Sequence, residues 1–146
     1  MGIPKMPVMR YRQRRRQPII CLDFDGVIHL HLSPWRGRAV ISDGPVQGAK
    51  EAVEDLRRRG NRIVVFSGRC ASDDGVNAIK VWLNRHDIEV DDVARNKPVA
   101  DLYVDDKAVT FRGDWVETLE AIHKFQQWQV LTKTRLRGLR KIRRLT

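Results

Sequence analysis

The chain has 146 residues, of which 42% are hydrophobic, so it is long enough for one globular domain with a buried core. No apolar run approaches the roughly 20 residues of a membrane helix, and no apolar signal-peptide segment follows the basic N-terminus. These features exclude an ordinary membrane-spanning or secreted class, and we expect a cytoplasmic protein.

The positive charge, +10 in total, is concentrated at the two ends of the chain. Residues 1–17 and 130–146 together hold thirteen Lys and Arg and no acid, whereas residues 18–129 carry all 18 acids and a net charge near −3. Cationic ends of this kind favour an anionic partner such as nucleic acid, and solubilising tails are the plainer alternative. We therefore divide the chain into a basic arm (1–17), a globular domain (18–129) and a basic tail (130–146) whose Leu and Ile spacing allows a helix.

The apolar run from Pro18 to Asp23 predicts a first strand, and it ends in two carboxylates, Asp23 and Asp25, followed by Gly26. Residues two apart on a strand point to the same face, so both acids would project together from its end. Two acids that close repel each other unless a cation lies between them. An acidic turn without further function is the alternative at this point.

Further along, apolar patterns of strand type alternate with patterns of helix type. This alternation predicts βαβ units and a Rossmann-like, three-layer α/β fold with a mostly parallel sheet. The expected elements are a loop or hairpin flap (29–44), a helix (45–59), a strand (62–67), a helix from Ser72 or Asp73 to Arg85, a short strand (88–93), a strand (101–105) and a helical region from Trp115 onward.

Chemically active residues follow several of these strands, and the carboxyl ends of parallel strands meet at one edge of a sheet. Asp105 and Asp106 end the fourth strand, and with the first acidic pair they supply the hard oxygen ligands that suit Mg²⁺. Ser67, the backbone N–H groups at Gly68 and the charge of Lys97 suit a phosphoryl group. The sequence therefore predicts a metal and a phosphate bound side by side, with one carboxylate attacking phosphorus and another transferring protons.

Four motifs in this order carry a resemblance to a known family: D-F-D-G-V at Asp23, V-V-F-S-G-R ending at Arg69, Lys97, and Y-V-D-D ending at Asp106. Over about residues 18–120 the chain resembles the haloacid dehalogenase superfamily. An Asp two positions after the first is the phosphatase pattern in that family.

The resemblance implies a Mg²⁺-dependent phosphatase that forms an aspartyl-phosphate. Asp23 would be the nucleophile and a metal ligand. Asp25 would be the general acid/base and would offer its backbone carbonyl to the metal. Ser67 and Lys97 would bind the phosphoryl group, and Asp106 would be the direct metal ligand with Asp105 in support.

The chain departs from many family members in having no room for a cap domain, because only about sixteen residues separate Ile28 from Pro45. The resemblance is thus to capless phosphatases. An open site admits a large phosphorylated substrate, such as a nucleotide or a nucleic acid 3′-phosphate end, or is closed by another subunit in a homo-oligomer.

Plain structural alternatives stay open for several residues. Lys97 can be a solvated loop lysine, and Ser67 a turn residue. Trp35 can stack on a substrate base or pack the flap against the core. We expect His29 and His31 to be flap residues rather than metal ligands. For the whole protein, the alternative is a nucleic-acid-binding protein that keeps the fold with little or no catalysis.

Overall fold

A computed structural model describes residues 16–131 and 133 of the chain. Most of the predicted arm and most of the predicted basic tail lie outside the described residues. In chain order the elements are β1 (Ile19–Asp23), α1 (Ala49–Arg58), β2 (Arg62–Phe66), a short 3-10 helix (Gly68–Ala71), α2 (Asp73–Arg85), β3 (Asp92–Val93), β4 (Leu102–Val104) and α3 (Trp115–Lys124).

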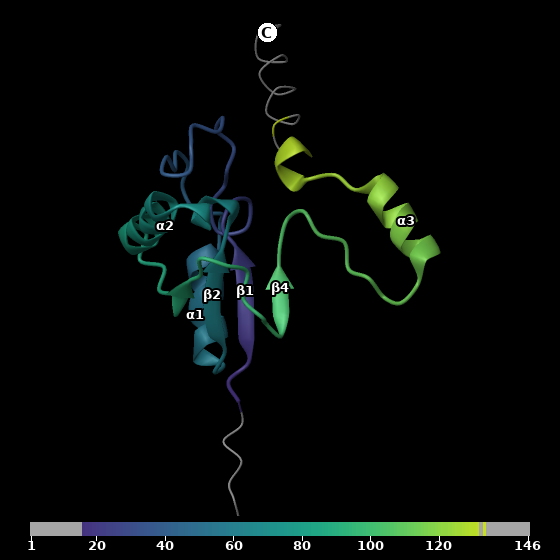
Figure 1. The fold of residues 1–146 in the computed structure, drawn as a ribbon, viewed down its shortest axis with the longest axis horizontal. Coiled ribbons are helices and arrows are strands. Elements are labelled where there is room, and N and C mark those ends of the chain that lie inside the picture. Colours follow the sequence, from purple (N-terminus) through teal and green to yellow (C-terminus); the bar gives the residue numbers. More distant parts are fainter. Residues whose placement is uncertain (1–15, 132, 134–146) are drawn as a thin grey trace, which may run out of the picture.

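The four strands form one parallel sheet in the order β3-β2-β1-β4 (Figure 1). β1 lies in the middle, with Leu22 opposite Val65 of β2 on one side and opposite Val104 of β4 on the other. The sheet is flanked by helices, so the architecture is the predicted Rossmann-like, three-layer α/β fold.

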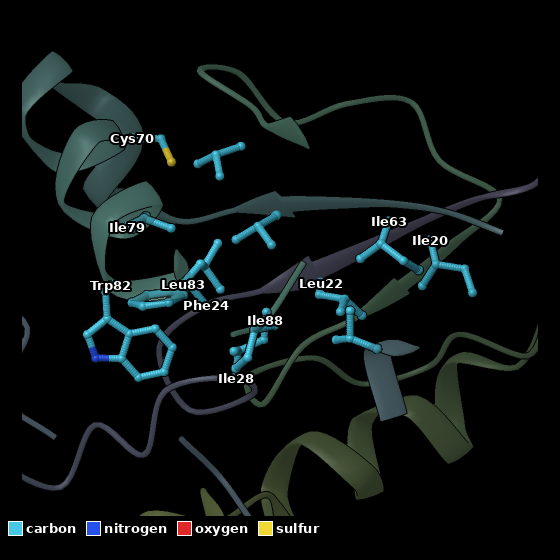
Figure 2. Close-up of a cluster of buried hydrophobic side chains, with 13 residues drawn as sticks. Ile20, Leu22, Phe24, Ile28, Ile63, Cys70, Ile79, Trp82, Leu83 and Ile88 are labelled. Carbon is cyan, nitrogen blue, oxygen red and sulfur yellow. The ribbon is translucent and has the colours of Figure 1, made fainter. Parts of the chain in front are cut away.

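The hydrophobic core lies between the sheet and the first two helices (Figure 2). Ile20 and Leu22 of β1 share a face with Ile63 and Val65 of β2, because the registers pair them directly. Val53 of α1, with Ile79 and Leu83 of α2, packs on that face. The chain steps from β1 to β2 to β3 in one direction, and right-handed crossovers therefore put α1 and α2 on the same side. Burying each large aliphatic side chain contributes about 1.5–3 kcal/mol.

The connection from β3 to β4, residues 94–101, runs back across β2 and β1 to reach the far edge of the sheet (Figure 1). Its start is fixed by the hydrogen bond from Ala94 N–H to the Val65 carbonyl. Its end is fixed by Asp101, whose N–H donates to the Ile19 carbonyl and whose Oδ2 accepts from Ile19 N–H. This connection carries Lys97.

Two predicted elements are shorter by more than two residues in the structure, for local reasons. α1 begins at Ala49 rather than at Pro45, because Gly48 has φ +82° and the Val46 N–H donates to the Ile28 carbonyl instead of entering a helix. The strand predicted over 88–93 is reduced to Asp92–Val93, because the N–H of Ile88 donates to the Leu83 carbonyl and completes the end of α2.

The side of the sheet at β4 is open compared with the core. Leu102, Tyr103 and Val104 of β4 are 55%, 43% and 39% exposed, and α3 also exposes its apolar residues. Asp114 caps α3 by accepting hydrogen bonds from the N–H groups of Val116 and Glu117. After α3 the chain becomes helical again at Trp128.

The connections at the carboxyl edge are small in the described part of the chain. β1 and α1 are joined by residues 24–48, and β2 and α2 by the 3-10 helix, so these described connections hold no cap domain, as predicted. None of the described helices combines the length and apolar character needed to cross a bilayer.

Candidate active site

Three carboxylates meet where β1 and β4 end side by side. Asp23, Asp105 and Asp106 each place an oxygen within 4.8 Å of the other two. Burial, followed by the charge of Asp105 and by the hydrogen-bonding contact and charge of Asp106, raises the pKa of Asp23 to about 8. A cation bound among these oxygens would reverse that effect, because it favours the charged form of each acid.

Asp106 provides an independent test of whether a metal ion fits this cluster. Its Oδ2 accepts a hydrogen bond of 2.8 Å from Gln129 Nε2, whereas its Oδ1 is buried and has no hydrogen-bond partner among the described residues. Buried carboxylate oxygens are normally paired. A free hard oxygen beside two more carboxylates suits a hard divalent cation, so the residues fit a metal of the Mg²⁺ kind.

The groups expected to bind a phosphoryl group lie around a cavity of about 160 Å³ next to Asp23. Ser67, Gly68 and Lys97 line this cavity together with Asp23 and Asp105. Ser67 directly follows β2 and caps the 3-10 helix, since its Oγ accepts from the N–H of Arg69 at 3.1 Å. The cavity is therefore lined by the hydroxyl of Ser67, the backbone at Gly68 and the ammonium of Lys97.

Lys97 is oriented by a neighbour on β4. Its Nζ lies 4.6 Å from the ring centroid of Tyr103, a cation–π contact. The Tyr103 hydroxyl in turn donates to the Pro98 carbonyl at 2.7 Å and accepts from the Ala100 N–H at 3.0 Å, which holds the lysine loop to the strand.

Asp25 is held as a carboxylate by several donors. Arg69 Nε lies 3.0 Å and 2.8 Å from its two oxygens, His29 Nδ1 lies 2.8 Å from Oδ1, and Ser67 Oγ lies 3.4 Å from Oδ2. Burial alone would raise the pKa of Asp25, but the hydrogen bonds from His29 and Arg69 together outweigh it and lower the pKa. These donors therefore hold Asp25 in its ionised form.

Arg69 is almost fully buried, at 2% exposed, and ties the flap to the sheet. Its Nη1 donates to three flap carbonyls, those of Gly37, Arg38 and Val40, at 2.9–3.1 Å. The ring of Trp35 lies over the same guanidinium, 4.4 Å from ring centroid to Cζ. Arg69 thus positions Asp25 and the flap together.

His29 and His31 lie with Asp25 in a second group whose ligand atoms are within 4.8 Å of one another. The ring of His29 already has two partners, because its Nε2 accepts from the Asp43 N–H at 3.2 Å and its Nδ1 therefore carries the hydrogen donated to Asp25. Arg69 occupies the other side of Asp25. We assign no metal to this group.

A larger cavity, of about 440 Å³, opens on the flap side of Asp23 and Asp25. It is lined by His31, Trp35, Arg38 and Lys107 together with Ser67, Gly68 and Asp105. Trp35 is 54% exposed, so its ring packs the flap onto Arg69 and also faces this cavity. Aromatic and cationic side chains thus surround the space next to the acids.

The seven residues predicted for the site lie together, lining the two cavities or belonging to the carboxylate group: Asp23, Asp25, Ser67, Gly68, Lys97, Asp105 and Asp106. The sequence did not predict the contacts of Arg69, although it stands in the second motif, or those of Gln127, Trp128 and Gln129. No spacing or motif in the sequence signals these contacts.

Comparison with known protein families finds no matching family model, and comparison with curated proteins finds no match. Among solved structures, the chain is similar to a conserved protein from Bacteroides thetaiotaomicron, with 25% identity over 74% of this chain and 91% of that one, at a TM-score of 0.49. It is also similar to chains of the Pnkp1/Rnl/Hen1 complex, described in one case as an RNA repair complex. Those likenesses have 16% and 15% identity, cover 88% of this chain and 42% and 38% of the other chains, and have TM-scores of 0.45 and 0.43. These likenesses are too distant to support a functional conclusion.

Proposed function

We propose that the protein is a Mg²⁺-dependent phosphomonoesterase of the haloacid dehalogenase type, without a cap, that works through an aspartyl-phosphate. The observation that carries this proposal is the position of Asp23. It belongs to the carboxylate group with Asp105 and Asp106, and it also lines the cavity of Ser67, Gly68 and Lys97.

In the first step a carboxylate oxygen of Asp23 attacks phosphorus, and the bond from phosphorus to the leaving oxygen breaks. Asp25 first takes up a proton from solvent and then gives it to that leaving oxygen, so the alcohol departs neutral. In the second step water attacks phosphorus, Asp25 takes its proton, and the bond from phosphorus to Asp23 breaks to release inorganic phosphate. Ser67, Gly68 and Lys97 hold the phosphoryl oxygens throughout.

Asp23 and Asp106 would hold the Mg²⁺, with Asp105 in support and the Asp25 backbone carbonyl as a further ligand. The bound ion would supply positive charge that neutralises the phosphoryl oxygens. The unpaired Oδ1 of Asp106 supports this assignment.

Replacement of the nucleophile tests the proposal most directly. Asp23→Asn should lower the turnover of a chromogenic aryl phosphate with Mg²⁺ by about 10⁴-fold or more, because the amide cannot form the covalent intermediate. Asp87→Asn, at an exposed position after α2, is the matched control and should turn over normally. Near-normal activity in Asp23→Asn, with a circular dichroism spectrum like that of the wild type, would reject the mechanism.

For the substrate we propose phosphorylated nucleotides or nucleic acid 3′-phosphate ends. The larger cavity supports this class, because Trp35 can stack on a base and Arg38 and Lys107 can meet backbone phosphates. The thirteen cations of residues 1–17 and 130–146 support a polyanion in particular.

Salt dependence distinguishes a polynucleotide from a small substrate. For the full chain, the KM of a 3′-phosphorylated oligonucleotide should rise steeply with salt, while the KM of the aryl phosphate changes little. Equal salt responses would remove nucleic acid from the proposal. Salt-sensitive oligonucleotide binding without any phosphate release would instead favour the alternative, a nucleic-acid-binding protein that keeps the fold without catalysis.

A further inference from the structure

We infer that the segment Gln127–Gln129 completes the metal site and that Gln129 is a positioning residue for Asp106. This inference rests on the proposed function, because it assigns to Asp106 the role of metal ligand. It extends that function by a residue outside the four motifs, which lies beyond α3 in the helical turn that begins at Trp128.

The segment contacts both the loop after β1 and the carboxylate of Asp106. Trp128 Nε1 donates to the Gly26 carbonyl at 2.7 Å, which fixes the loop after β1. Gln129 Nε2 and Gln127 Nε2 both donate to Oδ2 of Asp106, at 2.8 Å and 3.3 Å. Figure 1 shows this helical turn returning above the carboxyl end of the sheet, whereas α3 lies off to the side of β4.

Gly26 shows how closely these groups approach. A Cβ added at Gly26 would lie 2.1 Å from Gln129 Nε2 and 2.3 Å from Asp106 Oδ2, and its φ of +88° already favours glycine. The loop that follows the nucleophile therefore packs directly on the Gln129 amide and the Asp106 carboxylate, with no room for a side chain between them.

Two buried atoms at this contact point to a ligand. Gln129 is 6% exposed, yet its Oε1 has no hydrogen-bond partner among the described residues, and the same holds for Oδ1 of Asp106. A carboxylate only accepts hydrogen bonds, so the amide must present its NH₂ group to Asp106 and leave its carbonyl oxygen free. Buried oxygens of this kind are normally satisfied. A hydrated divalent cation would satisfy both, with its charge at Asp106 and its water hydrogens at Gln129.

The test measures Mg²⁺ binding to the full chain by isothermal titration calorimetry, without substrate. Gln129→Met keeps the length of the side chain but cannot hold Asp106, and Mg²⁺ affinity should fall about tenfold or more, the usual cost of removing a group that orients a metal ligand. Gln126→Met, at the exposed position three residues earlier, is the control and should stay within about twofold of the wild type.

A second variant separates positioning from a merely structural role. Gln129→Glu adds a carboxylate beside Asp106, so its Tm should fall below that of the wild type without Mg²⁺, and Mg²⁺ should raise its Tm by more than it raises that of the wild type. In Gln129→Met the rise with Mg²⁺ should be smaller than in the wild type. Variants with lowered Tm but an unchanged Mg²⁺-dependent rise would show that Gln129 only packs, and would overturn the inference.

The two proposals fail in different ways. If the wild type binds Mg²⁺ and Gln129→Met binds it equally well, the role of Gln129 is wrong and the phosphatase proposal stands. If the wild type binds no Mg²⁺, the metal site itself is absent and the proposed function fails with it.

Discussion

The half of the sheet at β2, here called the packed side, and the edge at β4, here called the open side, differ sharply in how deeply their residues are buried. Ile63 and Val65 of β2 are fully buried under α1 and α2, whereas every residue of β4 is exposed and α3 leaves Leu119 and Ile122 about half exposed. The site draws on both sides, with Asp23, Asp25 and Ser67 from the packed side and Lys97, Asp105 and Asp106 from the open side. Packing alone therefore cannot hold the site together, and specific polar contacts have to join its halves.

The largest loss of stability is expected when the hydrogen bonds of Arg69 on the packed side are removed. Arg69→Met removes a buried guanidinium from Asp25 and from three flap carbonyls. It should lower the free energy of unfolding by about 3–5 kcal/mol, because a partly buried carboxylate loses its cationic partner and the carbonyls lose their donor. Urea denaturation measures this change.

A matched Arg–Asp pair on the surface controls for the loss of an ion pair as such. Arg95 and Asp73 lie 2.7 Å apart with side chains 50% and 89% exposed. Arg95→Met should therefore cost less than about 1 kcal/mol. A similar cost for Arg69→Met and Arg95→Met would mean that the flap tie contributes little.

Truncation of one apolar residue on each side measures the difference in packing directly. Ile63→Ala should cost about 2–5 kcal/mol, because it leaves a cavity in a fully buried layer. Leu102→Ala on β4, where the side chain is 55% exposed, should change stability by only about 0.5 kcal/mol. A large loss for Leu102→Ala in thermal unfolding would show that a partner covers β4 in solution.

The smallest expected effect concerns the cysteines. Cys21 and Cys70 are both buried, and burial raises the pKa of each thiol. Iodoacetamide at pH 8 should leave both thiols unmodified in the native protein and should alkylate them in urea, as mass spectrometry can determine. Rapid alkylation of the native protein would contradict the packing around the 3-10 helix that holds Cys70.

The packed side was also the easier side to predict from the sequence. The apolar runs of β1 and β2 leave no competing pattern, and α2 has the predicted bounds because Ser72 caps it by accepting from the Gly75 N–H. The seven site residues were predicted to meet because the carboxyl ends of parallel strands share an edge. That rule needs only the order of strands and helices.

What could not be predicted depends on contacts between distant residues. Arg69 reaches Asp25 across 44 positions, and Gln129 reaches Asp106 across 23. No local propensity encodes either contact, because each depends on where a loop or a late helical turn lies in the finished fold. The start of α1 was wrong for a similar reason, since the Val46 N–H bonds to Ile28 rather than within the helix.

The hydrogen bond from Trp128 to Gly26 joins positions 102 residues apart, and this separation has a consequence during translation. At about 5–20 residues per second, a ribosome needs about 5 to 20 s to pass from Gly26 to Trp128. Throughout that time the nascent chain carries the loop after β1 without the segment that packs against it. The contact that joins residues 127–129 to the loop after Asp23 is therefore made late in synthesis, well after the strands of the packed side have been made.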